Sequence, residues 1–205
     1  MGNRSKIITS SLELFNLHGT RAVSTNHIAK AAGISPGNLY YHFKNKGEII
    51  CELFVQMSSC CEEAIPRNDP PAIASLEQMD EMLGKIKEIE WKFLFFGREM
   101  VNLIEQDDQL RELFLQMQSE RLLMIEASIR GMIASGLAVP LGETQIARLT
   151  EMIWLISIFW NPYLALRGEP ITQERMAESA QMVQMLVTPY LVGASSVVGA
   201  PGTSP

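Results

Sequence analysis

A short stretch near the start of the chain places the strongest constraint on the fold. Gly33 ends a helical pattern at residues 26–32, and Ser35-Pro36 comes two residues later. Glycine is typical of the end of a helix, serine caps the start of the next one, and proline suits its first position, where the N–H has no helical partner. The sequence therefore predicts two short helices joined by a tight turn, which is a helix-turn-helix arrangement.

Apolar residues recur at steps of three and four along most of the chain, and no segment alternates strictly with period two. This periodicity is typical of amphipathic helices, so we expect an all-α protein without strands. The predicted helices span residues 4–18, 26–32, 36–43, 46–64, 73–88, 90–106, 108–135, 143–167 and 172–192.

The prolines at positions 66, 70 and 71 mark the clearest break in this pattern. We divide the chain into a head at residues 1–47, which carries the helix-turn-helix, a helical body at residues 48–192, and a tail at residues 193–205. The tail is rich in Gly, Ala, Ser and Pro and carries no charge, so we expect it to be flexible.

The charge distribution separates head from body. Residues 1–50 contain six basic and two acidic side chains, a formal charge of +4, together with all three histidines. The remaining residues contain 11 basic and 21 acidic side chains, a formal charge of −10. A basic head on an acidic body indicates that the head contacts a polyanion such as nucleic acid.

Several other classes of protein fit poorly. Cys51, Cys60 and Cys61 form neither a disulfide framework nor a pattern of metal ligands, and no nucleophile motif accompanies His42. We therefore expect no enzymatic activity, no metal and no cofactor. The N-terminus lacks a signal-peptide pattern, and the uncharged run at 152–166 is shorter than the roughly 20 residues that span a bilayer. A cytoplasmic protein without membrane attachment is expected.

The second helix of the predicted motif has two distinct faces. Leu39 and Phe43 lie four residues apart and should point into the core of the head. The opposite face then presents groups that can contact base edges, base methyl groups or phosphates: Gly37, Asn38, Tyr41 and His42. Residues suited to hold flanking phosphates are Thr25, Lys44 and Lys46, together with the free N–H groups at helix starts.

The run from Ser24 to Lys46, STNHIAKAAGISPGNLYYHFKNK, closely resembles the DNA-binding domain of the tetracycline-repressor (TetR) family of bacterial regulators, and the match covers about 50 residues. The resemblance implies that Thr25 and Lys46 hold phosphates and that Tyr40 and Tyr41 contact phosphate or sugar. It also implies that a further set approaches the DNA groove: Ser35, Pro36, Gly37, Asn38 and His42. One departure is Gly47-Glu48 after Lys46, where members of the family commonly carry an acidic residue directly.

For the body, the resemblance implies an all-helical domain that dimerises through its last two long helices and usually encloses a ligand pocket. The candidate ligand-binding residues are apolar: Phe93, Phe96, Met100, Leu122, Ile125, Phe159 and Trp160. Arg98, Glu99 and Asn102 lie in the predicted helix at 90–106 and are candidate polar anchors for a ligand. A core with a dimer interface must nevertheless account for most of the apolar residues in these helices. Pro162 inside the predicted helix at 143–167 is expected to kink it.

Together these observations predict a homodimeric bacterial transcriptional regulator, a repressor that binds a palindromic operator in double-stranded DNA. The apolar lining favours release by a small hydrophobic effector, and the resemblance to members that govern lipid or polyester metabolism suggests an acyl-type compound. The alternative is a DNA-binding regulator controlled by a partner protein, with no small-molecule effector.

Overall fold

The structure is a computed structural model and describes residues 2–65, 73 and 75–193. Within these residues the chain forms nine α-helices and one short 3-10 helix, and the one β-type pairing is an isolated bridge between Ala138 and Leu191. The expectation of an all-α fold is thus confirmed. The elements are α1 (Asn3–His18), α2 (Thr25–Ala31), α3 (Pro36–His42), α4 (Lys46–Ala64), α5 (Leu76–Lys92), α6 (Leu94–Gln106), α7 (Asp108–Ala134), α8 (Glu143–Leu166), α9 (Gln173–Val187) and η1 (Thr188–Tyr190).

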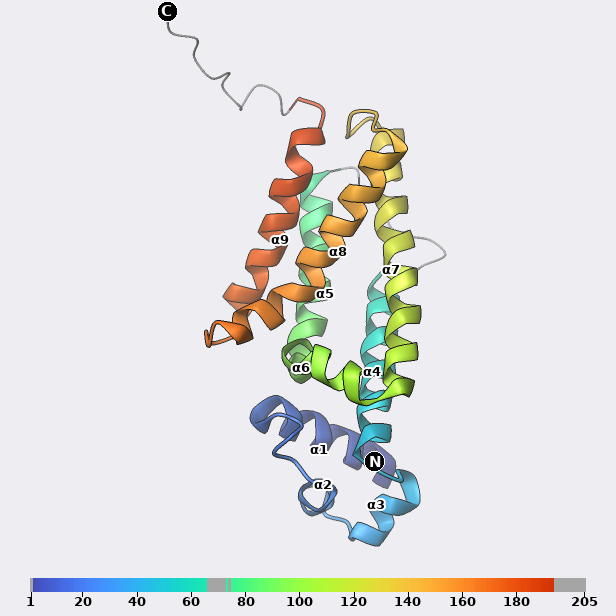
Figure 1. Cartoon of the computed structure of the whole chain (residues 1–205), viewed down its shortest axis with the longest axis vertical. Helices are drawn as coiled ribbons and strands as arrows, with labels where there is room; N and C mark the ends of the chain where they lie inside the picture. Colours follow the sequence, from blue (N-terminus) through green and yellow to red (C-terminus); the bar gives the residue numbers. More distant parts are fainter. Residues whose placement is uncertain (1, 66–72, 74, 194–205) are drawn as a thin grey trace, which may run out of the picture.

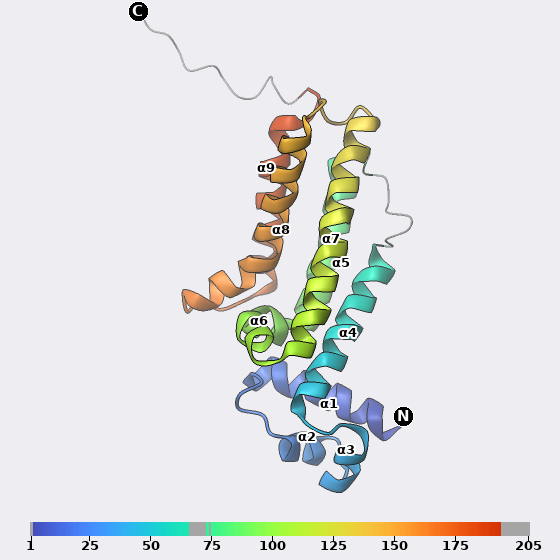
Figure 2. The same ribbon diagram turned by 45° about the vertical axis from the view of Figure 1, so that its right-hand side comes forward.

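The helices form an elongated molecule with a head at one end (Figure 1). Helices α1, α2 and α3 make up the head, and α4 runs from the head into the body. Helices α5, α7, α8 and α9 extend along the body, whereas α6 lies across its base, next to α1 (Figure 2). Helix α3 therefore lies at the tip of the head, at the opposite end of the molecule from the top of the body in Figure 1.

Side-chain caps explain where the helices of the head begin. The hydroxyl of Ser24 accepts a hydrogen bond from the backbone nitrogen of His27 at 3.2 Å, and the hydroxyl of Ser35 accepts one from that of Asn38 at 3.2 Å. Asn45 caps α4 in the same way. These bonds satisfy backbone donors that have no partner within the helix. Gly33 has a φ of 65°, so the turn between α2 and α3 uses a conformation that favours glycine.

One continuous hydrophobic cluster joins the head to the lower part of the body. Leu39 and Phe43, which the sequence predicts to point into the core of the head, are buried, as are Ile28, Ala29 and Ala32. They belong to the same cluster as buried residues of α4, α6 and α7, including Phe54, Phe96 and Leu110. Each fully buried side chain of this size contributes roughly 1.5–3 kcal/mol relative to exposure, so the position of the head is coupled to the packing of these helices. A second cluster fills the far end of the body.

Two predicted helix boundaries are wrong. The break expected near residue 89 lies at Phe93, between α5 and α6, and the helix expected to reach residue 192 ends at Val187. Pro189 accounts for the second difference because it cannot donate a backbone hydrogen bond, and a 3-10 turn follows instead. The predicted tail lies outside the described residues except for Gly193.

Helix α8 is the one described helix that is long and apolar enough to cross a membrane by length and composition. It packs against α6, α7 and α9, as a core helix of the body does. Beyond its middle the helix turns outward, away from α7 (Figures 1 and 2). Pro162 lies in this outward segment. It has no N–H to donate to the carbonyl of Ile158, which is a common cause of a kink.

Candidate nucleic-acid interface and internal cavity

The exposed face of α3 carries the polar side chains that the sequence predicts. Leu39, on the inner side of α3, is fully buried, whereas Ser35, Pro36 and Gly37 are exposed at the start of the helix. Tyr41 is 83% exposed, and its ring meets that of His42 edge-on at 5.1 Å between centroids. The helix thus presents a polar and aromatic surface supported by an apolar anchor, as an element that enters a DNA groove requires.

Two side chains predicted to contact DNA also make contacts within the head. The hydroxyl groups of Tyr40 and Thr25 lie 2.9 Å apart and share a hydrogen bond, which joins α3 to the start of α2. The side-chain oxygen of Asn38 accepts a hydrogen bond from the amide of Asn3 at 3.0 Å. Asn38 is therefore held in one orientation, with its own amide N–H groups still available to a base edge. No local pattern around Asn3 indicated this contact with Asn38.

The ammonium groups of Lys44 and Lys46 differ in whether they have hydrogen-bond partners within the head. Lys44 is exposed, and no described residue pairs with its ammonium group. The ammonium group of Lys46 donates to the backbone carbonyls of Thr20, at 2.5 Å, and Val23, at 3.0 Å. Lys46 therefore ties the start of α4 to the loop between α1 and α2, and this structural task accompanies its predicted phosphate contact.

A charged pair braces α1 against α4. Both guanidinium nitrogens of Arg4 bind the carboxylate of Glu52, at 3.1 and 2.8 Å, and the guanidinium also lies 5.1 Å from the centre of the Phe43 ring. The hydrogen bonds from Arg4 hold the pKa of the Glu52 carboxyl below its ordinary value, against a smaller opposing effect of burial. Because the guanidinium group of Arg4 is bound to Glu52, this basic side chain of the head is less available to a DNA phosphate.

Polar contacts link the head to α6. Arg98 donates to the carbonyls of Phe15 and Asn16 at the end of α1. Glu99 accepts from the backbone nitrogen and the hydroxyl of Thr20. Arg98 and Glu99 therefore face the head, and the expectation that they anchor a ligand in the body is wrong. Asn102 is also no cavity residue, because it is exposed and pairs with Gln106.

The body contains a cavity of about 190 Å³ on the inner side of α6. Helices α4 to α9 all contribute to its wall. Seven of the chain's 12 methionines line it: Met57, Met79, Met82, Met100, Met117, Met124 and Met132. Unbranched methionine side chains adapt to irregular apolar ligands, which suits the wall of a binding cavity.

The structure brings only part of the predicted ligand set to this cavity. The residues of that set that line it are Phe93, Phe96, Met100 and Ile125. Leu122, Phe159 and Trp160 lie outside the lining. The wall residues on α8 are spaced as one helix face: Ile153, Trp154, Ser157, Ile158 and Asn161. The sequence contains this spacing, but other aromatic residues of the same helix, such as Phe159 and Trp160, prevented its use as a prediction of the wall.

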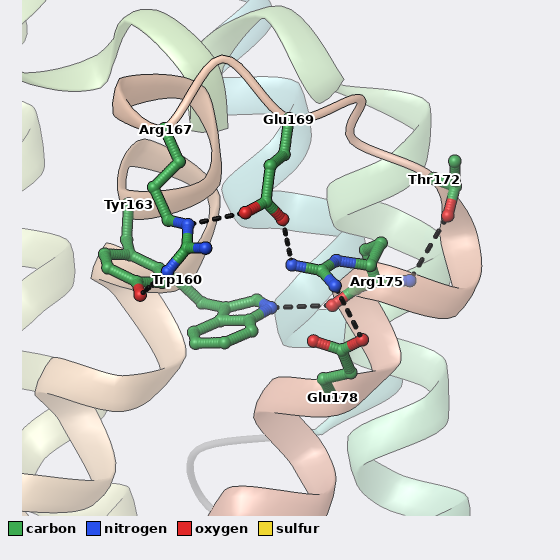
Figure 3. Close-up of polar contacts among 7 residues, drawn as sticks. All are labelled: Trp160, Tyr163, Arg167, Glu169, Thr172, Arg175 and Glu178. Carbon is green, nitrogen blue, oxygen red and sulfur yellow. Dashed lines mark hydrogen bonds and ion pairs between the residues drawn. The ribbon is translucent and has the colours of Figure 1, made fainter.

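Trp160 belongs instead to a polar cluster that closes the turn between α8 and α9 (Figure 3). Its indole nitrogen donates to the carbonyl of Arg175 at 2.6 Å, and its ring packs on Tyr163. Glu169 in the turn binds both Arg167 and Arg175. The cluster fixes the lower end of α8 against the start of α9, so Trp160 acts in holding the helix pair rather than in contacting a ligand.

The cavity wall contains few groups that titrate. Burial raises the pKa of the Cys61 thiol to about 11, so this side chain stays neutral at physiological pH. Glu90 is paired with Lys87 at 2.8 Å. Within the described part of the chain, no group of three or more His, Cys, Asp or Glu residues is placed to hold a metal ion. The largely apolar wall is thus suited to bind an apolar molecule.

The outer side of α8 exposes a row of large apolar residues. At the spacing of one helix face, the row consists of Met152, Leu155, Phe159 and Tyr163, all at least 39% exposed. Buried residues of α8, including Trp154 and Asn161, occupy the opposite side. An apolar row of this length on a long helix is typical of a surface that a second chain covers.

Comparisons with known proteins cover both parts of the chain. The family model described as "Bacterial regulatory proteins, tetR family" matches residues 7–53, and the model "TetR: Bacterial transcriptional repressor" matches residues 56–196. The transcriptional regulator AcrR of Shigella flexneri is 39% identical over 51 residues, which are 25% of this chain and 24% of that protein. QacR of Staphylococcus aureus is 42% identical over 53 residues, 26% and 28% of the two chains. The matches thus span about a quarter of these relatives.

Solved structures match over nearly the whole length. A TetR-family transcriptional regulator from Marinobacter aquaeolei VT8 has a TM-score of 0.83 and 33% identity, with 94% of this chain and 93% of that chain covered. SmeT, solved in complex with triclosan, has a TM-score of 0.64 and 17% identity, with 100% and 98% covered, which shows the same fold. Because the repressor model spans more than half of the chain, the chain belongs to the TetR family of bacterial transcriptional regulators.

Proposed function

We propose that this regulator is a homodimeric repressor that binds a palindromic operator in double-stranded DNA and releases it when a small hydrophobic or acyl-type molecule fills the cavity of the body. The proposal includes the cytoplasm as its place of action, because its partner is the bacterial chromosome. The observation that carries it is the pairing of an exposed polar recognition helix, α3, with a methionine-rich cavity in one continuously packed chain.

The predicted DNA contacts follow from the exposed face of α3 and its flanks. Gly37, Asn38 and His42 would approach base edges, whereas Thr25, Tyr40 and Lys44 would contact the phosphate backbone. Base contacts determine which sequence is preferred, and phosphate contacts contribute affinity for any sequence. These roles rest on the position of α3 and on the resemblance to the family.

The apolar row of α8 supports the homodimer. A two-fold dimer would pair this row and the neighbouring face of α9 with the same faces of a second copy, as a four-helix interface. Phe159 would lie in that interface rather than in the ligand site. Two heads related by a two-fold axis read two half-sites, and the half-sites are about one turn of DNA, ~34–36 Å, or more apart.

The route from cavity to head has a physical basis in α4 and α6. Helix α4 contributes Met57 and Cys61 to the cavity wall and begins in the head. Helix α6 contributes Phe96 and Met100 to the wall and holds the head through Glu99. A ligand that moves either helix would change the separation of the two heads. A typical coupling of ~1–3 kcal/mol would change operator affinity by roughly 5–150-fold.

Selection from random DNA duplexes tests the DNA-binding part of this proposal. The full-length protein is expected to enrich an inverted repeat, and Asn38→Ala should change the preferred bases at one position in each half-site while Tyr41→Phe leaves them unchanged. Enrichment without any inverted repeat would contradict the homodimeric repressor. Addition of apolar compounds to the protein–operator complex tests the second part, and if none weakens binding, control by a partner protein becomes the better explanation.

A further inference from the structure

One polar side chain in the apolar wall of the cavity lacks a partner. Asn161, on α8, is only 5% exposed and lines the cavity. Across the described residues, no group donates to or accepts from its side-chain amide. The amide atoms of Asn161 are not among the fully enclosed polar atoms that lack a partner, so they face the space of the cavity, where water or a ligand can bind them.

Of the other polar residues in the wall, Ser128, Glu90 and Arg121 have partners, and Ser157, which is less buried than Asn161, shows none among the described residues. The hydroxyl of Ser128 donates to the carbonyl of Met124 at 2.9 Å, and the carboxylate of Glu90 binds Lys87 at 2.8 Å. Arg121, which is partly exposed, contacts the sulfur of Met124 at 3.4 Å. Asn161 is the one polar residue of this lining that is buried, and it offers both an acceptor oxygen and two N–H donors.

The surroundings of Asn161 leave little room for it to turn away. A Cβ atom added to Gly97, on α6, would lie 2.9 Å from its side-chain nitrogen and 3.4 Å from its Cβ. Glycine at position 97 thus allows the backbone of α6 to pass directly beside this amide. Pro162, which has no backbone N–H, directly follows Asn161 within α8.

We propose that Asn161 is the polar anchor of the effector, and that the effector is a neutral apolar molecule with a hydroxyl group, such as an alcohol or a phenol. This inference rests on the proposed function, because it concerns the ligand of the same cavity. A hydroxyl group donates to the amide oxygen of Asn161 and accepts from its nitrogen, so one group uses both capacities. The apolar remainder of the molecule would lie against the methionines.

The charges around the cavity favour a neutral ligand over a charged one. Glu90 is already neutralised by Lys87, so it gives little attraction to a cation. Arg121 also lines an open surface groove between α4 and α7, where Glu62, Glu63 and Glu120 surround it. These carboxylates offset the attraction of Arg121 for an anion. A fully charged group inside the apolar wall would therefore lose its hydration without a matched partner.

The same contact links the ligand to the head. Gly97 touches Asn161, and the next two residues of α6, Arg98 and Glu99, hold the end of α1 and the residue after Gly19. A ligand bound to Asn161 would press on α6 at the residue next to these contacts. Recognition of the ligand's hydroxyl group and movement of the head would thus both depend on residues 97–99 of α6.

Calorimetric titration of the full-length protein with four eight-carbon probes tests the anchor: 1-octanol, 1-fluorooctane, octanoate and octylammonium. We expect octanol to bind about tenfold more tightly than fluorooctane, which corresponds to one hydrogen bond. Asn161→Leu, which keeps the branched shape of the side chain, should lose this preference by weakening octanol alone. Ser128→Ala, at a partnered polar residue of the same wall, should preserve the preference.

Three results would overturn the anchor. They are equal binding of octanol and fluorooctane to the wild type, an unchanged preference in Asn161→Leu, and tighter binding of octanoate or octylammonium than of octanol. Failure of all four probes to bind also counts against the ligand class. Duplex selection is carried out without ligand, so an enriched inverted repeat beside any of these results would leave the DNA-binding function standing and reject only the anchor.

Discussion

Glu99 on α6 accepts hydrogen bonds from the backbone nitrogen of Thr20 at 3.1 Å and from its hydroxyl at 2.5 Å. Thr20 follows Gly19, the residue that ends α1 with a φ of 77°. A Cβ atom at Gly19 would lie 2.9 Å from a carboxylate oxygen of Glu99, so both the conformation and the space favour glycine there. Removal of Glu99 would leave the buried Thr20 without its polar partner.

We expect Glu99→Ala to lower the free energy of unfolding by about 1–3 kcal/mol, the usual range for hydrogen bonds to a charged group. The substitution should also weaken the effect of a ligand on operator affinity, because α6 would then move without carrying the head. Chemical denaturation and titration of operator DNA with and without ligand measure the two effects. Glu105→Ala, at an exposed position on the same helix, serves as the control and should change neither quantity.

The helix boundary between α5 and α6 could not be predicted from local sequence. No glycine or proline lies at Phe93, where the helix breaks. Asn16 of α1 instead donates to the carbonyl of Lys92 and accepts from the backbone nitrogen of Phe95, both at 2.9 Å. A side chain 79 residues away from Phe95 thus satisfies the backbone groups that the break exposes. Only the tertiary structure brings this cap to its place.

The caps and core of the head, by contrast, follow from local sequence. Ser35, Asn45 and Gly33 act within a few residues of their own position, so their effects could be predicted. The cavity residues could be predicted only in part. Helices α7 and α8 carry apolar residues on more than one face, and the sequence does not say which face meets the cavity and which meets solvent, as Phe159 illustrates.

The two lysines next to α3 should respond differently to substitution. Lys44→Ala is expected to weaken binding to all duplexes and to lower the slope of log affinity against log salt by about 0.9 for each half-site, without loss of stability. Lys46→Met should in addition lower the free energy of unfolding by about 1–3 kcal/mol, because two backbone carbonyls lose a charged donor. Salt titrations and denaturation curves separate these effects. An unchanged slope for Lys44→Ala would remove it from the phosphate contacts.

The Arg4–Glu52 pair should make the stability of the head depend on pH. Hydrogen bonds from Arg4 lower the pKa of Glu52 in the folded state, so the stabilising contribution is present above the ordinary pKa of 4.5 and is lost as the pH falls toward the lowered value. Both side chains are partly exposed, so we expect Glu52→Gln to cost less than about 1 kcal/mol at pH 7. The difference from wild type should shrink below pH 4.5, and Glu13→Gln, at an exposed site on α1, should show no such trend.

The apolar row of α8 makes the oligomeric state sensitive to one charge. Phe159 is 45% exposed in the single chain, and in a two-fold dimer it would be buried against the same row of a second copy. Phe159→Lys would then place an ammonium group in an apolar interface without a partner, and the cost of removing that charge from water should shift the protein to monomers at micromolar concentration. Light scattering measures the mass directly. Leu17→Lys, at an exposed apolar residue of α1, should remain dimeric and bind the operator, whereas a Phe159→Lys protein that is still dimeric would show that the chains pair through another surface.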